Sequence, residues 1–211
     1  MNNPEKIEEP VGGAIILAGG DSKRLGRPKA LLDFNGKSLI AHLVEMLREL
    51  FDQITIVTDR PEPYKRLPVI ITGDLIKQKL KSPLRGIHAG LSSSELPFQF
   101  VAACDMPFLN PDLIEYMAQF AHDYDAVVPR AGSYFQPLHA FYSRSCIEII
   151  EKQISKDHFK VTDLYSNLKI RFIDSAEIAR FDPEELSFFN INTWTDYEQA
   201  LAIMAKRLKT G

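Results

Sequence analysis

The sequence predicts an α/β fold of three layers, with a mostly parallel mixed sheet covered by helices on both faces. Short apolar segments of strand type alternate along the chain with amphipathic segments of helical period, a pattern typical of strand–helix–strand units. The 211 residues are 45% hydrophobic, which is enough apolar material for a core that needs no disulfide. No internal repeat or low-complexity tract interrupts the alternation. We therefore expect a Rossmann-like arrangement, in which crossover helices connect parallel strands.

The expected strands are short runs rich in β-branched or aromatic side chains, bounded by polar or turn-forming residues. The first stops at two glycines, the third follows a proline, and the fourth ends at an acidic residue. In chain order the strands cover 13–18, 54–58, 69–72, 98–103, 126–129, 138–142 and 169–173.

The expected helices are stretches in which apolar residues recur at a spacing near 3.6. The first has the clearest pattern, because its apolar residues from Leu39 to Leu50 share one face. Pro111 suits the first position of a helix, and Thr195 with Glu198 is typical of a capping box at the start of the last one. In chain order the helices cover 37–50, 84–93, 111–121, 145–154 and about 196–208, with 161–167 as a further candidate.

The loop after the first strand is the most informative segment of the chain. Residues 14–29 read Ala-Ile-Ile-Leu-Ala-Gly-Gly-Asp-Ser-Lys-Arg-Leu-Gly-Arg-Pro-Lys. The paired glycines allow backbone N–H groups to approach a ligand closely, and cations beside them suit phosphate oxygens. The spacing fits neither a Walker A loop nor a dinucleotide fingerprint. We expect this loop to hold a nucleoside triphosphate; a basic surface turn is the alternative. Its cations are Lys23, Arg24, Arg27 and Lys29.

A single acidic residue, Asp105, ends the fourth strand. Ligands of such sheets bind beyond the carboxyl ends of the strands, so Asp105 and the glycine loop are expected at the same edge. Magnesium prefers hard oxygen ligands and often takes one carboxylate together with substrate phosphates. Asp105 is therefore the expected Mg²⁺ ligand. The alternative is that its side chain caps the following turn.

Two of these motifs carry a family resemblance. The string Leu-Ala-Gly-Gly-x-Ser-x-Arg-x-Gly-x-x-Lys and the segment Cys-Asp-Met-Pro-Phe resemble those of nucleotidyltransferases with a glycosyltransferase-A-like fold. Among them the chain is most similar to the molybdenum cofactor guanylyltransferases, from about residue 13 to 202. Cytidylyl relatives carry Leu-Ala-Ala-Gly, and the extra glycine here implies room for guanine. The resemblance implies Mg²⁺-dependent transfer of GMP from GTP to the terminal phosphate of molybdopterin, with release of pyrophosphate.

The resemblance also implies which residues form the site. Arg24, Lys29 and Asp105 would act in catalysis. Asn190 and Asn192, which share one side of an extended segment, would bind the pterin or its phosphates. Contacts to the nucleotide are implied for Leu17, Ala18, Gly19, Gly20, Lys29, Asp74 and Asp105.

Two positions differ from the family pattern, and one histidine is interpreted as structural. Ser82 stands where the family usually has a glycine before Pro-Leu-x-Gly, and Val57 stands where some relatives have an asparagine that contacts the nucleotide. Valine cannot supply that contact, so base or ribose recognition is expected from Asp59 or from the backbone of the paired glycines. His139 lies among apolar residues and is interpreted as a satisfied core group rather than a catalytic one.

Composition limits the partners. A net charge of −3 and a pI of about 6.0 argue against nucleic acid as a ligand, and no apolar stretch is long enough for a membrane span. Cys104 and Cys146 form no zinc pattern and suggest a reducing, cytoplasmic setting. We expect a flexible N-terminal tail at 1–12 and a single nucleotidyltransferase domain at 13–211. The partners implied are GTP, molybdopterin or the molybdenum cofactor, other cofactor-biosynthesis proteins and molybdoenzyme chaperones.

Two other functions stay open at this point. One is a related nucleotidyltransferase that uses CTP or a sugar-phosphate acceptor. The other is a non-catalytic protein that binds GTP or molybdopterin and delivers the cofactor to other proteins. The second would bind nucleotide without releasing pyrophosphate, which separates it from both enzymes.

Overall fold

The computed structural model describes residues 12–19, 25–76 and 82–210. Within them the main sheet has eight strands in the order β10-β7-β9-β6-β1-β4-β5, with β8 paired to β7. The expected tail at 1–12 lies outside the described residues except for Gly12. The strands are β1 (Gly13–Leu17), β4 (Ile54–Val57), β5 (Ile70–Thr72), β6 (Phe98–Ala103), β7 (Ala126–Ala131), β8 (Tyr134–Phe135), β9 (His139–Ser143) and β10 (Ile170–Ile173).

Most strand pairs in this sheet are parallel. β1 pairs in parallel with both β4 and β6, and β4–β5 and β7–β10 are also parallel. β9 is the exception in the middle of the sheet, because it runs antiparallel to both β6 and β7. The mixed, mostly parallel sheet expected from the alternation of elements is therefore confirmed.

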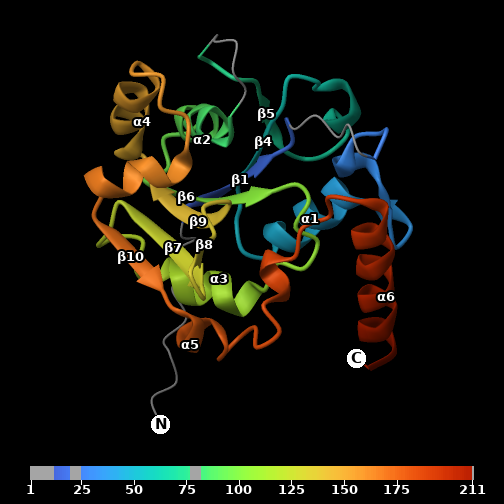
Figure 1. Cartoon of the computed structure of the whole chain (residues 1–211). Coiled ribbons are helices and arrows are strands. Elements are labelled where there is room, and N and C mark those ends of the chain that lie inside the picture. Colours follow the sequence, from blue (N-terminus) through green and yellow to red (C-terminus); the bar gives the residue numbers. More distant parts are fainter. Residues whose placement is uncertain (1–11, 20–24, 77–81, 211) are drawn as a thin grey trace.

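Helices cover both faces of the sheet (Figure 1). α1 (Leu39–Arg48), α3 (Pro111–Ala118) and α5 (Ser175–Ile178) lie on one face, and α2 (Pro83–Ser92) and α4 (Cys146–Ile154) lie on the other. Successive side chains of β1 point to opposite faces: Ile16 packs into the core with α1 and α3, while Ile15 packs into the core with α2 and α4. Each face thus has its own apolar core, as the three-layer prediction requires.

Two glycines let α2 approach β1 closely. A Cβ built on Gly90 would lie 2.6 Å from side-chain atoms of Ile15, and one built on Gly86 would lie 3.0 Å from a methyl carbon of Leu17. A larger residue at position 90 would hold the helix away from the strand. The glycines therefore place the first turn of α2 beside the carboxyl end of β1, where the loop expected to bind phosphate begins.

The first helix starts two residues later than expected, because a hairpin precedes it. β2 (Asp33–Phe34) pairs in antiparallel fashion with β3 (Lys37–Ser38). The turn is Asn35-Gly36, with φ of 58° and 81°, a conformation that this dipeptide favours in two-residue hairpins. Ser38 then caps α1 by accepting a hydrogen bond from the N–H of Ala41 at 3.4 Å.

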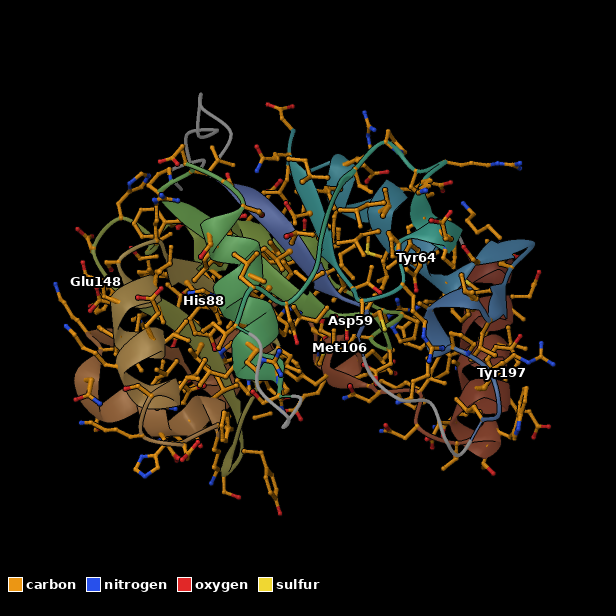
Figure 2. The ribbon with its side chains drawn as sticks, turned by 90° about the horizontal axis from the view of Figure 1, so that it is seen from above. Asp59, Tyr64, His88, Met106, Glu148 and Tyr197 are labelled. Atoms are coloured by element: carbon orange, nitrogen blue, oxygen red, sulfur yellow. The ribbon has the colours of Figure 1, made fainter. Side chains whose placement is uncertain are left out.

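α6 (Trp194–Thr210) stands apart from the sheet, beside the β2–β3 hairpin (Figure 1). Figure 2 shows Tyr197 of this helix next to the hairpin segment, and its hydroxyl donates a hydrogen bond to the Asp33 carbonyl. A third apolar cluster holds the helix in place. It comprises Leu25, Leu32, Phe34, Leu39, Phe108, Ile191 and Ala200.

The capping box of α6 lies two residues before the expected position. The N–H of Asp196 donates to Thr193 Oγ1 at 3.2 Å, and the Asp196 carboxylate accepts from the N–H of Thr193 at 2.8 Å. Thr195 and Glu198 therefore do not form the box. The remaining helical segments are short 3-10 turns at Lys29–Leu31, Glu62–Tyr64, Val161–Asn167 and Leu186–Phe188.

Candidate active site

A pocket of about 410 Å³ lies at the carboxyl ends of β1, β4 and β6, where the first turn of α2 meets them. Its walls come from the ends of these strands, from the segment at 28–30 and from the start of α2. The sequence-expected residues that line it are Leu17, Ala18, Gly19, Lys29, Asp74 and Asp105. Gly20 and Arg24 lie outside the described residues.

Three side chains distant in the sequence meet at the edge of this pocket. Lys29 Nζ lies 2.8 Å from Asp105 Oδ2 and 2.7 Å from Asn192 Oδ1. The side chains of Lys29 and Asp105 are 19% and 17% exposed, so solvent reaches the pair but does not surround it. The backbone holds the arrangement, since the N–H of Ile191 donates to the Asp105 carbonyl at 2.9 Å. The structure thus brings together the glycine loop's last lysine, the acid after β6 and the second asparagine of the Asn-x-Asn motif.

The two asparagines of that motif do not behave alike. Asn192 accepts a hydrogen bond from Lys29, whereas the Nδ2 group of Asn190 donates to the Phe188 carbonyl at 2.7 Å. The Asn190 amide therefore braces the turn before α6. The N–H of Asn192 donates to the Asp196 carboxylate, and this bond is the main cause that lowers the pKa of Asp196. The cap of α6 and the position of Asn192 are thus linked.

Asp74 also lines the pocket, and it pairs with a residue that the sequence motifs did not single out. Arg85 of α2 places its guanidinium Nη2 atom 3.2 Å from Asp74 Oδ2, and its side chain is only 6% exposed. Arg85 occupies the variable position of the Pro-Leu-x-Gly motif. The sequence held one signal for a pair of this kind: a charged residue occupies a position that α2 turns toward the sheet. A buried arginine nearly always has a partner of opposite charge.

The wall near β4 is apolar except at its rim. Val57 is buried and lines the pocket, so it offers no polar contact there. Asp59, which is exposed, lies two residues farther along on the same wall, and Figure 2 shows its side chain near the centre of this edge. Gly19 has open space where a Cβ would point. Asp59 and Gly19 thus both border the space that a ligand in the pocket would fill.

Cys104 and Tyr64 contribute bulk rather than reactivity. Burial, with a smaller contribution from the charge of Asp105, raises the pKa of the Cys104 thiol to about 12. The thiol is therefore protonated at neutral pH and is a poor nucleophile. Burial likewise raises the pKa of the Tyr64 hydroxyl. Neither group is suited to covalent or general-base chemistry.

His139 is a core residue, as expected, but it is not a satisfied one. It is fully buried between the rings of Phe100 and Phe188, whose centroids lie 5.0 and 5.2 Å from its own. Neither ring nitrogen has a hydrogen-bond partner among the described residues. Burial lowers its pKa to about 3, so the imidazole is neutral at physiological pH.

The donor set fits a hard divalent cation that is shared with a substrate. Asp105 Oδ2 is bound to Lys29, and the second oxygen of the carboxylate has no hydrogen bond to a described residue. No group of three or more His, Cys, Asp or Glu side chains suited to a metal occurs among the described residues. A cation here would therefore need oxygens from a bound phosphate beside the Asp105 carboxylate.

None of the described helices has the length and apolar character needed to cross a bilayer.

Known proteins resemble this chain over nearly its whole length. A relative from Peptoclostridium acidaminophilum, named probable molybdenum cofactor guanylyltransferase, is 40% identical, with 95% of this chain and 93% of that protein covered. A relative from Syntrophotalea carbinolica, named molybdenum cofactor guanylyltransferase, is 35% identical, with 89% and 90% covered.

The crystal structure of molybdopterin-guanine dinucleotide biosynthesis protein A from Archaeoglobus fulgidus is similar with a TM-score of 0.80. It is 29% identical to this chain, with 92% of this chain and 99% of that one covered. Residues 14–169, which include the pocket, Lys29 and Asp105, match the family described as the MobA-like NTP transferase domain. The chain therefore belongs to the family of MobA-like NTP transferases.

Proposed function

We propose that this protein transfers GMP from GTP to the terminal phosphate of molybdopterin and forms the guanine dinucleotide form of the cofactor. The observation that carries the proposal is the contact of Lys29 with Asp105 and Asn192 at the edge of a pocket bordered by Gly19. The chain is a nucleotidyltransferase by family, and relatives with 35–40% identity carry the name of this activity.

The pocket would hold the nucleoside of GTP, with its phosphates directed toward Lys29. Asp59 and the Gly19 backbone are the polar groups that suit the base or ribose, and Asp74 is held in place by Arg85. Nucleotidyltransferases of this kind generally need a divalent metal, for which we propose Mg²⁺ held by Asp105. When bound, the ion would neutralise charge on the phosphates. Lys29 would add a second positive charge beside the reacting phosphoryl group.

The reaction needs little proton transfer. An oxygen of the molybdopterin phosphate attacks the α-phosphorus of GTP, a new P–O bond forms, and the bond to the β-phosphate oxygen breaks to release pyrophosphate. The attacking phosphate is already an anion near neutral pH. Positioning and charge neutralisation therefore account for most of the catalysis, in agreement with a site where Cys104 stays protonated and His139 is buried outside the pocket lining.

The test is an assay of the full chain with Mg²⁺, GTP and molybdopterin, in which both pyrophosphate and the dinucleotide are measured. We expect equal amounts of both products. Asp105→Asn should abolish their formation at every Mg²⁺ concentration, while Asp112→Asn, at an exposed carboxylate of α3, should leave it unchanged. If the wild-type chain forms no dinucleotide from GTP, the proposal is wrong.

Two alternatives give different results in the same setting. A CTP-dependent or sugar-phosphate enzyme would be stabilised against heat more by CTP, ATP or UTP than by GTP in the presence of Mg²⁺. A delivery protein would bind GTP or molybdopterin without releasing pyrophosphate.

A glycosyltransferase has less support. Many such enzymes bind metal through Asp-x-Asp, and this chain has one such triplet at 123–125. It precedes β7, however, and the Asp125 carboxylate accepts hydrogen bonds from the Lys169 N–H and the Ser145 hydroxyl, which gives it a structural role.

We also propose that the reaction takes place in the cytoplasm. Cys104 and Cys146 are both free thiols, and free thiols persist in a reducing compartment. Contacts with other cofactor-biosynthesis proteins or molybdoenzyme chaperones belong to the same proposal.

A further inference from the structure

We propose that Arg27 and Trp194 form a binding surface for the acceptor, with Trp194 taking its planar heterocycle and Arg27 taking its phosphate. The inference rests on the proposed function and assigns residues to the second substrate, a phosphorylated pterin. We refer to these two residues as the acceptor platform.

The contact of Arg27 with Trp194 lies next to the contact of Lys29 with Asn192, between the same two segments of the chain. Lys29 contacts Asn192 at 2.7 Å, and two residues away on each segment the Arg27 guanidinium lies 5.4 Å from the centre of the Trp194 ring. The two segments therefore face each other at two successive positions. Trp194 is therefore only two residues from Asn192, which contacts the lysine that borders the nucleotide pocket.

The platform also lies outside the lining of the pocket that would hold the nucleotide. Lys29 and Asp105 line the pocket, whereas Arg27, Asn192 and Trp194 are not part of its lining. In-line displacement needs the attacking phosphate and the departing pyrophosphate on opposite sides of the α-phosphorus. A second substrate approaching from the Asn192 side satisfies this requirement without sharing space with the nucleoside.

Residues other than Trp194 fasten α6 to the rest of the molecule. The cluster that fastens the helix contains Ile191 and Ala200, and Tyr197 adds its hydrogen bond to Asp33. Trp194 is outside that cluster and is 43% exposed. Its ring contacts Tyr197 edge-on, with centroids 5.6 Å apart, which fixes its orientation. A large aromatic side chain that is oriented but exposed is a ready surface for stacking.

The chemistry of the pair matches a phosphorylated heterocycle. Flat heteroaromatic rings stack on tryptophan with little dependence on their exact substituents. A guanidinium binds phosphate through paired N–H donors, and a ring beneath it lowers the entropy lost on binding by holding it in one place. Arg27 contacts the Trp194 ring and stands two residues before Lys29 in the chain, so it suits an acceptor phosphate that is directed toward the reacting phosphorus.

Kinetics with each substrate varied separately test the platform. In Trp194→Ala we expect the KM for molybdopterin to rise about tenfold, the effect of losing one stacked ring, with the KM for GTP unchanged. Trp194→Phe should recover most of the loss. Tyr134→Ala removes another exposed aromatic residue, on β8, and should change neither constant. Arg27→Met should raise the KM for molybdopterin, and Arg27→Lys should do so less.

Binding can also be followed without turnover, because Trp194 is the single tryptophan of the chain. Saturating molybdopterin should protect its fluorescence from quenching by acrylamide, and GTP alone should leave the quenching unchanged. A wild-type KM for molybdopterin in Trp194→Ala, or an equal rise in both KM values, would overturn the platform while dinucleotide formation by the wild type continues. If the wild type forms no dinucleotide, the proposed function is wrong, but this result alone does not address the platform. The platform is rejected as well if molybdopterin does not protect the Trp194 fluorescence from quenching.

Discussion

Asp105 and Asn192, the hydrogen-bond partners of Lys29 given above, are of different chemical kinds, and this determines what Lys29 can do when a substrate arrives. Its bond to Asp105 is an ion pair between groups less than one-fifth exposed, whereas its bond to Asn192 is to a neutral amide on an exposed residue. The amide is the partner that costs less to replace. A phosphate can therefore take the place of Asn192 while the charge balance with Asp105 is kept.

Replacing Lys29 tests its charge directly. We expect Lys29→Ala to lower kcat by a factor on the order of 10² or more, because a positive charge beside the reacting phosphoryl group is lost. Pyrophosphate release under saturating GTP and molybdopterin measures it, with Lys29→Arg as the control that keeps the charge. Unchanged turnover in the alanine variant would remove Lys29 from the mechanism.

The pair of Arg85 with Asp74 leads to a prediction about the stability of the fold. Arg85→Met should lower the free energy of unfolding by about 2–3 kcal/mol, because Asp74 would keep its charge in a half-enclosed position after losing this ion pair. Urea unfolding measures the loss. Adding Asp74→Asn should restore part of it, and a double variant as unstable as the sum of the singles would contradict the pairing.

At the scale of single elements, the close packing of α2 against β1 depends on glycines, which have no side chain. Its first turn borders the pocket, and its distance from the sheet is set by Gly86 and Gly90 against two side chains of β1. Ile15 is fully buried and has no room to move away. The helix therefore transmits any change in its packing to the pocket edge formed by Ser82 and Pro83.

Gly90→Ala should show this sensitivity. The added methyl group would meet Ile15 at 2.6 Å, and the strain should exceed the gain of about 1 kcal/mol in helix propensity. We expect a net loss of about 1–2 kcal/mol in thermal or urea unfolding. Combining it with Ile15→Val should recover part of the loss relative to Ile15→Val alone, and strict additivity of the two changes would argue against a direct clash.

For the whole molecule, acid sensitivity follows from His139. Its pKa is about 3 in the folded protein and near 6.5 in the unfolded chain, so the unfolded state binds the proton first as pH falls. The stability due to this group is complete above pH 6.5 and is lost as pH drops below that value. At pH 5 the loss should be about 2 kcal/mol. Urea unfolding at pH 7 and pH 5 should show it in the wild type, and His139→Leu should reduce the difference by that amount.

The sequence was sufficient for the arrangement of layers but not for several contacts of the site. Periodicity located the strands and helices, because burial on one face repeats along each element. It did not reveal the antiparallel direction of β9, which depends on pairing with both β6 and β7. The Asn35-Gly36 turn was a local signal that was overlooked. The position of Arg85 in its helix was a signal for a buried, paired arginine, but not for Asp74 as the partner. The stacking of Arg27 on Trp194 could not be foreseen, since it depends on how segments far apart in sequence approach one another.

The meeting of Lys29, Asp105 and Asn192 joins positions 76 and 163 residues apart, and this has a consequence for the protein as it is being synthesised. A ribosome has translated both the lysine and the acid long before it reaches the asparagine. During that interval every residue that lines the pocket, from Leu17 to Leu138, has been made, whereas Asn192, which we propose to lie on the acceptor side, has not. By the roles proposed above, group transfer therefore has to wait until Asn192 has been made, and a product truncated before that residue would bind GTP without consuming it.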